Sequence, residues 1–340
     1  MNPVVLVAGG AGFIGTNFIR HCLATSNFRV VNLDALTYAG GADAAQRYGG
    51  EGRYRFVKGR IGDSRLVGSL LAEEKPSLIV NLAAETHVDR SIADAAPFVQ
   101  SNIVGCDVLL RSALRYWERM DSDTQGAFRF LQVSTDEVYG DVPEAVSSSE
   151  ESVFLPNSPY SASKAAAEHF VRAYRVTYGL PTLTVRACNN FGPFQFPEKL
   201  IPTMISRALR DEALPVYGDG GQIREWIYVD DMCSALMMVL RSGESGDVFN
   251  IGTGFQKTNL EVVEVLLAKL EVVTGRKSAS VVAHVEDRLG HDRRYSIDST
   301  KIMNKFGFSP ELSFEEGMQS TISWYVANRD WLRSRAGIAV

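Results

Sequence analysis

The stretch VVLVAGGAGFIG, from Val4 to Gly15, decides the fold of this chain. Val4–Ala8 is a short apolar run of the kind that forms a buried parallel strand. Gly9, Gly12 and Gly15 follow with G-x-x-G-x-x-G spacing, and a helical pattern then continues to Leu23. Such glycines allow a tight turn and a close approach of backbone to a pyrophosphate, which the helix N-terminus attracts. The stretch therefore predicts a dinucleotide-binding site.

Strand-like and helical segments alternate through the first half of the chain. Alternation of this kind is typical of a parallel sheet with helices on both faces. We therefore predict an α/β fold built on a doubly wound parallel sheet of the Rossmann type. Its further strands are expected at Val30–Leu33, Tyr54–Val57, Leu78–Leu82, Phe128–Val133 and Thr182–Val185.

The pattern changes after Arg186, where prolines become frequent and a strand-like run at Val248–Ile251 precedes a helix from about Leu260. We expect an NAD-type dinucleotide-binding domain over residues 1–186, which also takes part of residues 225–252. A second, smaller α/β domain, mainly residues 187–340, is expected to bind the substrate. The polar run Ser147–Glu151 is expected to be a surface loop.

Composition narrows the class of protein. The chain has 340 residues, and its net charge of −5 argues against nucleic-acid binding, which requires a basic face. Four widely separated cysteines without a C-x-x-C pair fit a reduced, cytoplasmic protein whose cysteines are packing residues, and they predict no metal site. No apolar run approaches the ~20 residues of a membrane helix, and the N-terminus lacks signal-peptide features.

Asp34 indicates which dinucleotide binds. It ends the second predicted strand, 19 residues after Gly15. A carboxylate at this place accepts hydrogen bonds from the adenosine ribose hydroxyls and repels a 2′-phosphate. We therefore predict NAD, rather than NADP, as the cofactor.

Tyr160 and Lys164 form a Y-x-x-x-K pair just after Pro159, a residue typical of helix starts. Residues four apart share one face of a helix. An ammonium group beside a phenol favours the phenolate, so we expect Lys164 to lower the pKa of Tyr160 from its usual value of about 10. Tyr160 is then a candidate base for a substrate hydroxyl. Taken alone, the pair also fits a solvated helix face.

Thr135, Asp136 and Glu137 lie where the fifth predicted strand ends, the position that faces the ligand crevice in a doubly wound sheet. Thr135 can hydrogen-bond a reacting oxygen, and two adjacent carboxyl groups suit a paired acid and base. Neighbours on a strand point to opposite faces, so the chain must leave strand geometry here if both carboxyls are to reach one substrate. The alternative is a solvated acidic loop.

The chain resembles the extended short-chain dehydrogenase/reductase superfamily and, within it, the dTDP-glucose 4,6-dehydratases. The matching stretches keep the order of the family over nearly the whole chain. They are GGAGFIG from Gly9, DALTYAG from Asp34, LAAETHVDRSI from Leu82, STDEVYG from Ser134, SPYSASKAAAEH from Ser158, NNFGPFQFPEKLIP from Asn189, GQIREWIYVDD from Gly221 and DRLGHDRRY from Asp287.

This resemblance implies a role for each catalytic residue. Tyr160 takes the C4-hydroxyl proton of the sugar while the C4 hydride passes to NAD, and Lys164 also holds the nicotinamide ribose. Thr135 polarises the C4 ketone, Glu137 takes the C5 proton, and protonated Asp136 gives its proton to the departing C6 hydroxyl. The hydride then returns to C6, which leaves a 4-keto-6-deoxy sugar.

Binding residues are also implied. Beside the glycines, Tyr160 and Lys164, those for NAD are Phe13, Ile14, Asp34, Leu36, Thr37, Ile61, Leu82, Ala83, Ala84, Ser101 and Asn190. Those for the nucleotide sugar are Thr86, Thr135, Asn189, Glu198, Lys199, Leu200, Pro215, Tyr217, Arg224, Asn259, Arg288 and His291. Arg224 and Arg288 are expected to fork onto phosphate oxygens.

Arg60 departs from the family pattern, which usually has Gly-Asp-Ile after the third strand, with the aspartate accepting from the adenine amino group. Here the stretch is Gly59-Arg60-Ile61. An arginine side chain is a donor only and cannot make that contact, but guanidinium groups stack on aromatic rings. We expect Arg60 to contact the cofactor in this altered way, with weaker or altered adenine recognition. Asp34 opposes a switch to NADP.

Three alternatives stay open. A nucleotide-sugar 4-epimerase or a uronate decarboxylase shares the glycine loop and the Y-x-x-x-K pair, but needs no acid/base pair such as Asp136 and Glu137. A non-catalytic NAD-binding regulator has no need to keep Thr135, Tyr160 and Lys164 together. A UDP-glucose 4,6-dehydratase shares most of these motifs, so the nucleobase can be thymine or uracil.

The family commonly forms homodimers through two helices of each subunit, which here are expected at about Pro97–Trp117 and Pro159–Tyr178. Ile103, Val104, Val108 and Leu109 offer apolar side chains for such an interface. Inward packing explains these four residues equally well.

Overall fold

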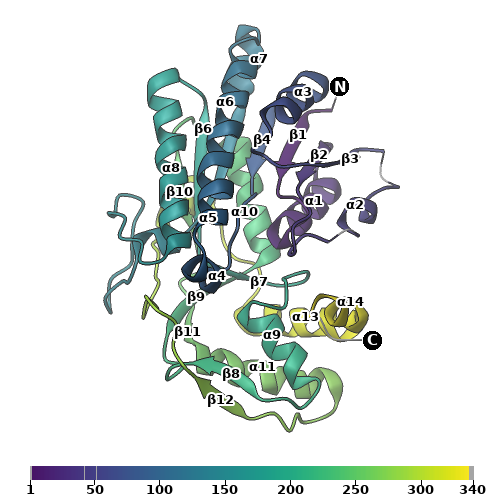
Figure 1. The fold of residues 1–340 in the computed structure, drawn as a ribbon, viewed down its shortest axis with the longest axis vertical. Helices are drawn as coiled ribbons and strands as arrows, with labels where there is room; N and C mark the ends of the chain where they lie inside the picture. The colour runs from purple at the N-terminus through teal and green to yellow at the C-terminus, as the bar shows by residue number, and fades with distance from the viewer. Residues whose placement is uncertain (1, 42, 51, 337–340) are drawn as a thin grey trace.

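The computed structural model describes residues 2–41, 43–50 and 52–336. A seven-stranded, all-parallel sheet occupies the upper part of the molecule, with the strand order β10-β6-β5-β4-β1-β2-β3 (Figure 1). The predicted α/β fold with a doubly wound sheet is thereby confirmed. The strands are β1 Val4–Ala8, β2 Arg29–Asp34, β3 Tyr54–Lys58, β4 Leu78–Asn81, β5 Arg129–Thr135, β6 Thr182–Ala187 and β10 Val248–Ile251.

Helices cover both faces of this sheet because its strands are apolar on both sides. Val5 and Val7 of β1 lie in the core that α1 and α10 cover, whereas Leu6 and Ala8 lie in the core under α3, α6 and α8. The helices around the sheet are α1 Phe13–Thr25, α2 Ala44–Arg47, α3 Ser64–Glu74, α4 Val88–Ala93, α5 Ala96–Phe98, the π-helix η1 Val99–Gly105, α6 Cys106–Trp117, α7 Ser122–Ala127, the 3-10 helix η2 Asp136–Tyr139, α8 Pro159–Tyr178, α10 Val229–Ser242 and α12 Thr300–Phe306.

The lower part of the molecule contains two small sheets and its own apolar core (Figure 1). One sheet has the order β11-β9-β7 and the other pairs β12 with β8. The strands are β7 Asn189–Phe191, β8 Leu214–Tyr217, β9 Ile223–Tyr228, β11 Gln256–Thr258 and β12 Val282–Val285, and the helices are α9 Leu200–Ala208, α11 Asn259–Thr274, α13 Phe314–Ala327 and α14 Arg329–Arg335. Strand β10 nevertheless belongs to the upper sheet, so the chain passes back between the two parts.

Local signals place the start of α8, the helix that carries Tyr160 and Lys164. Ser158 caps it in a reciprocal capping box with Ser161, and Pro159 occupies the first turn, where a missing N–H costs nothing. The helix ends at Tyr178 and is followed by the cap residue Gly179, whose φ of +76° is the left-handed conformation that glycine adopts without strain. Tyr160 therefore lies in the first turn of a firmly defined helix start.

The segment Ser147–Glu151 is more than the expected surface loop. Ser148 is buried and forms a parallel bridge with Ile297. The Glu150 carbonyl accepts a hydrogen bond of 2.9 Å from Arg186 Nη1. The prediction is wrong at these positions because contacts with residues far along the chain, which local polarity does not reveal, bury part of the segment.

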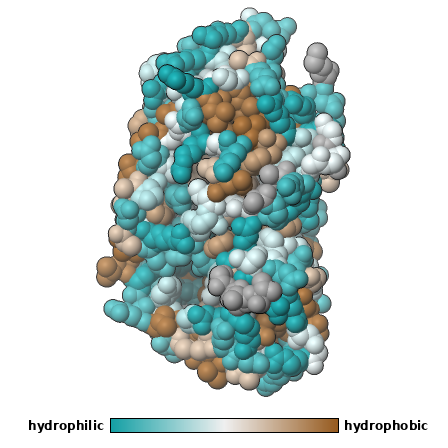
Figure 2. Space-filling view, turned by 45° about the vertical axis from the view of Figure 1, so that its right-hand side comes forward, coloured by the Kyte–Doolittle hydropathy of each residue, from teal (hydrophilic) through white to brown (hydrophobic). Residues whose placement is uncertain are grey.

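Other sequence-based expectations can be compared with the described residues. All four cysteines are buried and free. No helix in the described ranges has the length and apolar character to cross a membrane. On the face drawn in Figure 2, hydrophobic patches lie among hydrophilic residues, as on most globular proteins.

Candidate active site

A continuous groove runs along the carboxyl ends of the parallel strands. It consists of three adjoining cavities: a dinucleotide end, a central chamber and a lower end. The dinucleotide end and the chamber share Gly9, Gly12, Ala39, Leu82 and Ala84 as lining residues. The chamber and the lower end share Glu137, Asn189, Glu198 and Lys199. Such a groove is where doubly wound folds bind their ligands.

The structure brings nearly all of the predicted site residues to this groove. The dinucleotide end contains Gly9, Gly12, Asp34, Thr37, Arg60, Ile61, Leu82, Ala83, Ala84 and Ser101. The chamber adds Phe13, Ile14, Gly15, Thr86, Thr135, Asp136, Glu137, Tyr160, Lys164, Asn189, Asn190, Glu198 and Lys199. The lower end adds Leu200, Pro215, Tyr217, Arg224, Asn259, Arg288 and His291. Leu36 is the exception; it does not line the groove, and its backbone N–H donates to Asp34 Oδ1 at 2.7 Å.

The glycine loop fits a dinucleotide. Gly12 begins α1, and among the described residues no side chain caps this helix, so its free N–H groups face the groove. Gly9 has φ of +79°, and a Cβ there would lie 2.6 Å from Ala83 N. A Cβ on Gly15 would lie 2.3 Å from Gly9 O. Only glycine allows this close approach of three chain segments below the helix N-terminus.

Asp34 is held at the groove by two backbone N–H groups. Oδ2 accepts from Ala11 N at 2.8 Å, and Oδ1 accepts from Leu36 N. Burial raises the pKa of Asp34, and these two hydrogen bonds oppose the rise. The carboxyl group is thus oriented before any ribose arrives, and its remaining lone pairs are available to hydroxyl donors.

The chain leaves strand geometry at the acid pair, as the prediction for Asp136 and Glu137 required. Strand β5 ends at Thr135, and η2 begins at Asp136 with about three residues per turn. Thr135 caps this turn: its Oγ1 accepts from Glu137 N at 3.3 Å and donates to Asp136 Oδ1 at 3.1 Å. The tight turn therefore brings both carboxyl groups to the wall of one chamber.

The environments of the two carboxyl groups differ. Asp136 is buried, and its Oδ2 has no hydrogen-bond partner among the described residues. Burial, with the charges of Glu137 and Glu225, raises the pKa of Asp136 well above its ordinary value. Burial also raises the pKa of Glu137, but the positive charges of Arg288, Lys199 and Arg224 oppose that rise. Two carboxyl groups whose pKa values are pushed apart in this way are typical of a paired acid and base.

The expected effect of Lys164 on Tyr160 is wrong in this structure. Burial and the charge of Glu137 raise the pKa of Tyr160 above its usual value. Lys164 Nζ instead donates to the Val133 carbonyl at 2.7 Å, and burial lowers the pKa of Lys164 to about 8. Helical spacing alone does not reveal that an acceptor on β5 takes the ammonium group.

At the lower end, the guanidinium donors of Arg224 are not free for phosphate oxygens, contrary to what was expected. Its guanidinium donates to the Ile223 carbonyl at 2.8 Å and to the Asp292 carbonyl at 2.9 Å, and it lies 4.1 Å from the Tyr295 ring centroid. Arg288 is less engaged, since its Nε has no partner within the described part of the chain. Arg288 is therefore the better candidate for gripping an anion.

Sequence reasoning did not single out Asp89, which lines the lower end, or Tyr38 and Arg90, which contact other residues beside the groove. Asp89 accepts a 2.8 Å hydrogen bond from Tyr217, and Tyr38 donates to Glu198 at 3.0 Å. Arg90 lies over the Tyr38 ring at 3.7 Å. Two signals were available. Asp89 and Arg90 follow the carboxyl end of β4 and Tyr38 follows that of β2, and all three lie in stretches that match the family.

Comparison with known proteins agrees with this geometry. The family described as GDP-mannose 4,6 dehydratase matches residues 6–321. The dTDP-glucose 4,6-dehydratase of Xanthomonas campestris pv. campestris (strain B100) is 48% identical over 332 residues, covering 96% of this chain and 94% of that protein. The low-salt glycan biosynthesis protein Agl12 of Haloferax volcanii is 51% identical over 324 residues, covering 95% and 99%.

A solved structure has the same fold. DesIV, a dTDP-glucose 4,6-dehydratase from Streptomyces venezuelae solved with NAD bound, superposes with a TM-score of 0.88 at 42% identity, covering 96% of this chain and 98% of that one. The similarity thus extends over the sheet, the groove and the lower part alike. This chain belongs to the GDP-mannose 4,6 dehydratase family, among relatives named dTDP-glucose 4,6-dehydratase.

Proposed function

We propose that the chain catalyses the NAD-dependent 4,6-dehydration of dTDP-glucose, giving dTDP-4-keto-6-deoxyglucose and water. The observation that carries this proposal is the state of Asp136: a buried carboxyl group with an unpartnered oxygen, on the same chamber wall as Glu137 and Tyr160. A protonated acid beside an ionised base suits the removal of water from adjacent carbons. The relatives named dTDP-glucose 4,6-dehydratase support the choice of substrate.

In the proposed mechanism, each residue acts on a stated atom. Tyr160 Oη, in its phenolate form, removes the proton of the C4 hydroxyl, and the Thr135 hydroxyl donates to the C4 oxygen. When bound, NAD would supply both the oxidant and the reductant of the cycle, as the acceptor of the C4 hydride and its donor to C6. The C4 ketone acidifies C5, so Glu137 can remove the C5 proton. Asp136 then gives its proton to the C6 hydroxyl, which leaves as water. As C6 is reduced, Glu137 returns a proton to C5, which completes the 4-keto-6-deoxy sugar.

Binding is proposed to divide along the groove. The glycine loop and Asp34 hold NAD, while Arg288 and Tyr217 at the lower end hold the nucleotide diphosphate. Residues 1–186, with strand β10, would form the NAD-binding domain, and most of residues 187–340 the nucleotide-sugar domain. Four free, buried thiols fit a reducing compartment, so we also propose a cytoplasmic location, which cell fractionation can test.

The product formed from dTDP-glucose tests the proposal. Purified protein is incubated with dTDP-glucose, and separately with UDP-glucose, without added reductant. The expected product of dTDP-glucose has lost one water per sugar. A product of unchanged mass with inverted C4 would instead indicate an epimerase, and faster turnover of UDP-glucose would reassign the nucleobase. No turnover of either sugar would contradict an enzymatic role.

Activity is expected to depend on pH with two limbs. Glu137 must be ionised, so activity falls as the pH decreases through its raised pKa. Asp136 must be protonated, so activity falls as the pH increases through its strongly raised pKa. Because Arg288 lowers the pKa of Glu137, Arg288→Met should move the acidic limb to higher pH and leave the alkaline limb in place.

The pH profile of kcat/KM checks this prediction, because it reports the groups of the free enzyme. Arg293→Met is the matched control, since Arg293 pairs with Asp219 at the surface and does not line the groove. An acidic limb that stays at the same pH in Arg288→Met would show that Arg288 does not act on Glu137.

Arg60 is expected to affect NAD affinity. It is exposed at the dinucleotide end, and its positive charge acts on the half-buried Glu85 of the same cavity. If its guanidinium stacks on the adenine, Arg60→Asp replaces that contact with an acceptor and should change the Kd for NAD, by about two- to fivefold given stacking of 0.5–1 kcal/mol. Isothermal titration of the cofactor-free protein with NAD measures this. An unchanged Kd would exclude a role for the side chain.

A homodimer through η1, α6 and α8 is also proposed. Val104 is 40% exposed and Phe170 on α8 is 39% exposed, whereas Leu109 is fully buried and packs inward. Exposed apolar side chains on neighbouring helices fit an interface between copies. Light scattering should give twice the mass of one chain, and Val104→Glu should halve it. A wild-type mass of one chain would contradict the dimer.

A further inference from the structure

Behind the chamber, Arg186 of β6 connects two elements that both carry catalytic groups. This arginine is buried, with 6% of its surface exposed. Its Nε and Nη2 both lie 2.9 Å from Glu168 Oε2. Its Nη1 donates to the Tyr139 hydroxyl at 2.7 Å. The Nε and Nη2 atoms of the guanidinium therefore bind α8, and its Nη1 atom binds η2, so that Arg186 joins the two elements.

Both partners lie close in sequence to the residues assigned to the chemistry. Glu168 follows Lys164 by four residues and Tyr160 by eight, so all three side chains lie along one buried face of α8. Tyr139 is the last residue of η2, two positions after Glu137. Arg186 thus contacts the turn that carries Asp136 and Glu137, and also the helix that carries Tyr160 and Lys164.

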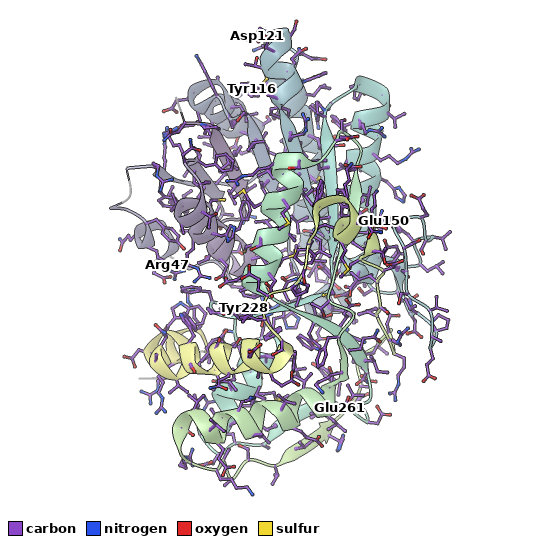
Figure 3. The ribbon with its side chains drawn as sticks, turned by 180° about the vertical axis from the view of Figure 1, so that it is seen from behind. Arg47, Tyr116, Asp121, Glu150, Tyr228 and Glu261 are labelled. Atoms are coloured by element: carbon purple, nitrogen blue, oxygen red, sulfur yellow. The ribbon has the colours of Figure 1, made fainter. Side chains whose placement is uncertain are left out.

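The rest of the network leaves Arg186 little freedom. The Tyr139 hydroxyl donates onward to Asn250 Oδ1 at 2.8 Å, and the Glu150 carbonyl accepts from Arg186 Nη1. The guanidinium carbon lies 4.6 Å from the Phe154 ring centroid. Figure 3 labels Glu150, whose segment supplies this carbonyl to Arg186.

We propose that Arg186 is a positioning residue that sets the distance between the Tyr160–Lys164 pair and the Asp136–Glu137 pair. The inference rests on the proposed function, in which the first pair acts at C4 and the second at C5 and C6 of one ring. The two pairs come from different elements, so their separation requires a common support. A planar guanidinium with fixed donor directions provides such a support better than a flexible ammonium group.

Tyr139→Phe tests this role with the least disturbance, because it keeps the ring and removes only the hydroxyl. The turn η2 then loses its bond to Arg186, while α8 keeps the Glu168 bond. Elimination should slow more than oxidation at C4, so kcat should fall by about tenfold, in line with the cost of small misplacements. Reduced nicotinamide should accumulate on the enzyme during turnover, visible in its near-ultraviolet absorbance. If Tyr139 had a purely structural role, the rate of elimination relative to the rate of oxidation at C4 would not change.

Tyr116→Phe is the matched control. Its hydroxyl donates to the Pro76 carbonyl at 3.2 Å, before the amino end of β4 and away from the groove, in the upper region labelled in Figure 3. Arg186→Lys is the second variant: it keeps a charge for Glu168 but cannot also reach Tyr139 in the same geometry, so it should show the same accumulation.

The outcomes separate this inference from the proposed function. If the wild-type protein forms no product from dTDP-glucose, both the proposed function and the positioning role of Arg186 are wrong. Wild-type turnover, with no more reduced cofactor in Tyr139→Phe than in Tyr116→Phe, overturns the positioning role alone. A fall in kcat without accumulation of reduced nicotinamide also overturns the positioning role, because oxidation at C4 would then have slowed as much as elimination.

Discussion

Asp136→Asn is expected to reduce kcat by about 10²–10⁴-fold, the usual contribution of a positioned general acid. Asp136 is isosteric with asparagine, so the buried turn η2 should keep its shape. An amide cannot deliver a proton to the departing C6 hydroxyl, whereas Tyr160 and Thr135 remain able to support oxidation at C4. The variant should therefore oxidise dTDP-glucose once and then stall with reduced nicotinamide bound.

A single-turnover experiment checks this prediction by following reduced nicotinamide and product together. Asp123→Asn, a substitution of an exposed aspartate on α7, is the control and should behave as the wild type. Wild-type product formation by Asp136→Asn would mean that another group supplies the proton. Failure to form any reduced nicotinamide would place Asp136 in the oxidation step instead.

The second large effect is expected in the glycine loop, where alanine substitutions of two glycines should affect stability and NAD binding differently. A Cβ on Gly15 would lie 2.3 Å from Gly9 O and 2.6 Å from Gly10 Cα, and these backbone atoms cannot turn aside. Gly15→Ala should therefore destabilise the protein by about 1–3 kcal/mol, as overpacking does, and lose NAD binding. A Cβ on Gly12 meets only Gly9 O, at 3.4 Å.

Gly12→Ala should thus fold normally but bind NAD at least about tenfold more weakly, because the added methyl group blocks the close approach of the pyrophosphate. Thermal unfolding of the cofactor-free proteins and titration with NAD separate the two effects. Gly68→Ala on α3 is the control, since a Cβ there has nothing within 4 Å. If Gly15→Ala melts and binds NAD as the wild type does, the packing account of this loop is wrong.

Much of this arrangement was predictable from local patterns. The glycine spacing and the apolar runs located the strands of the seven-stranded sheet to within about two residues, because most of them are buried and bounded by turn residues. The requirement that the chain turn after Thr135 followed from strand geometry alone, and η2 fulfils it. Placing Asp34 at the groove required only its position at the end of β2.

The remaining features depend on contacts between distant residues, which no local pattern contains. Lys164 finds its acceptor on β5, and Arg224 uses its donors on nearby carbonyls rather than leaving them free. The link from Arg186 to Tyr139 joins residues 47 positions apart. In each case the sequence shows the charged residue, but its hydrogen-bond acceptor lies elsewhere in the chain and is brought close only by folding.

The fate of deuterium placed at C4 of dTDP-glucose tests the central claim, that one closed groove holds the oxidising pair and the acid/base pair around a single sugar. The labelled substrate is mixed with substrate carrying heavy carbon, and the product is examined by mass spectrometry and NMR. We predict a dehydrated product with the deuterium at C6 and none in the heavy-carbon molecules. Deuterium that remains at C4, passes to solvent or appears in the heavy-carbon product would contradict the account.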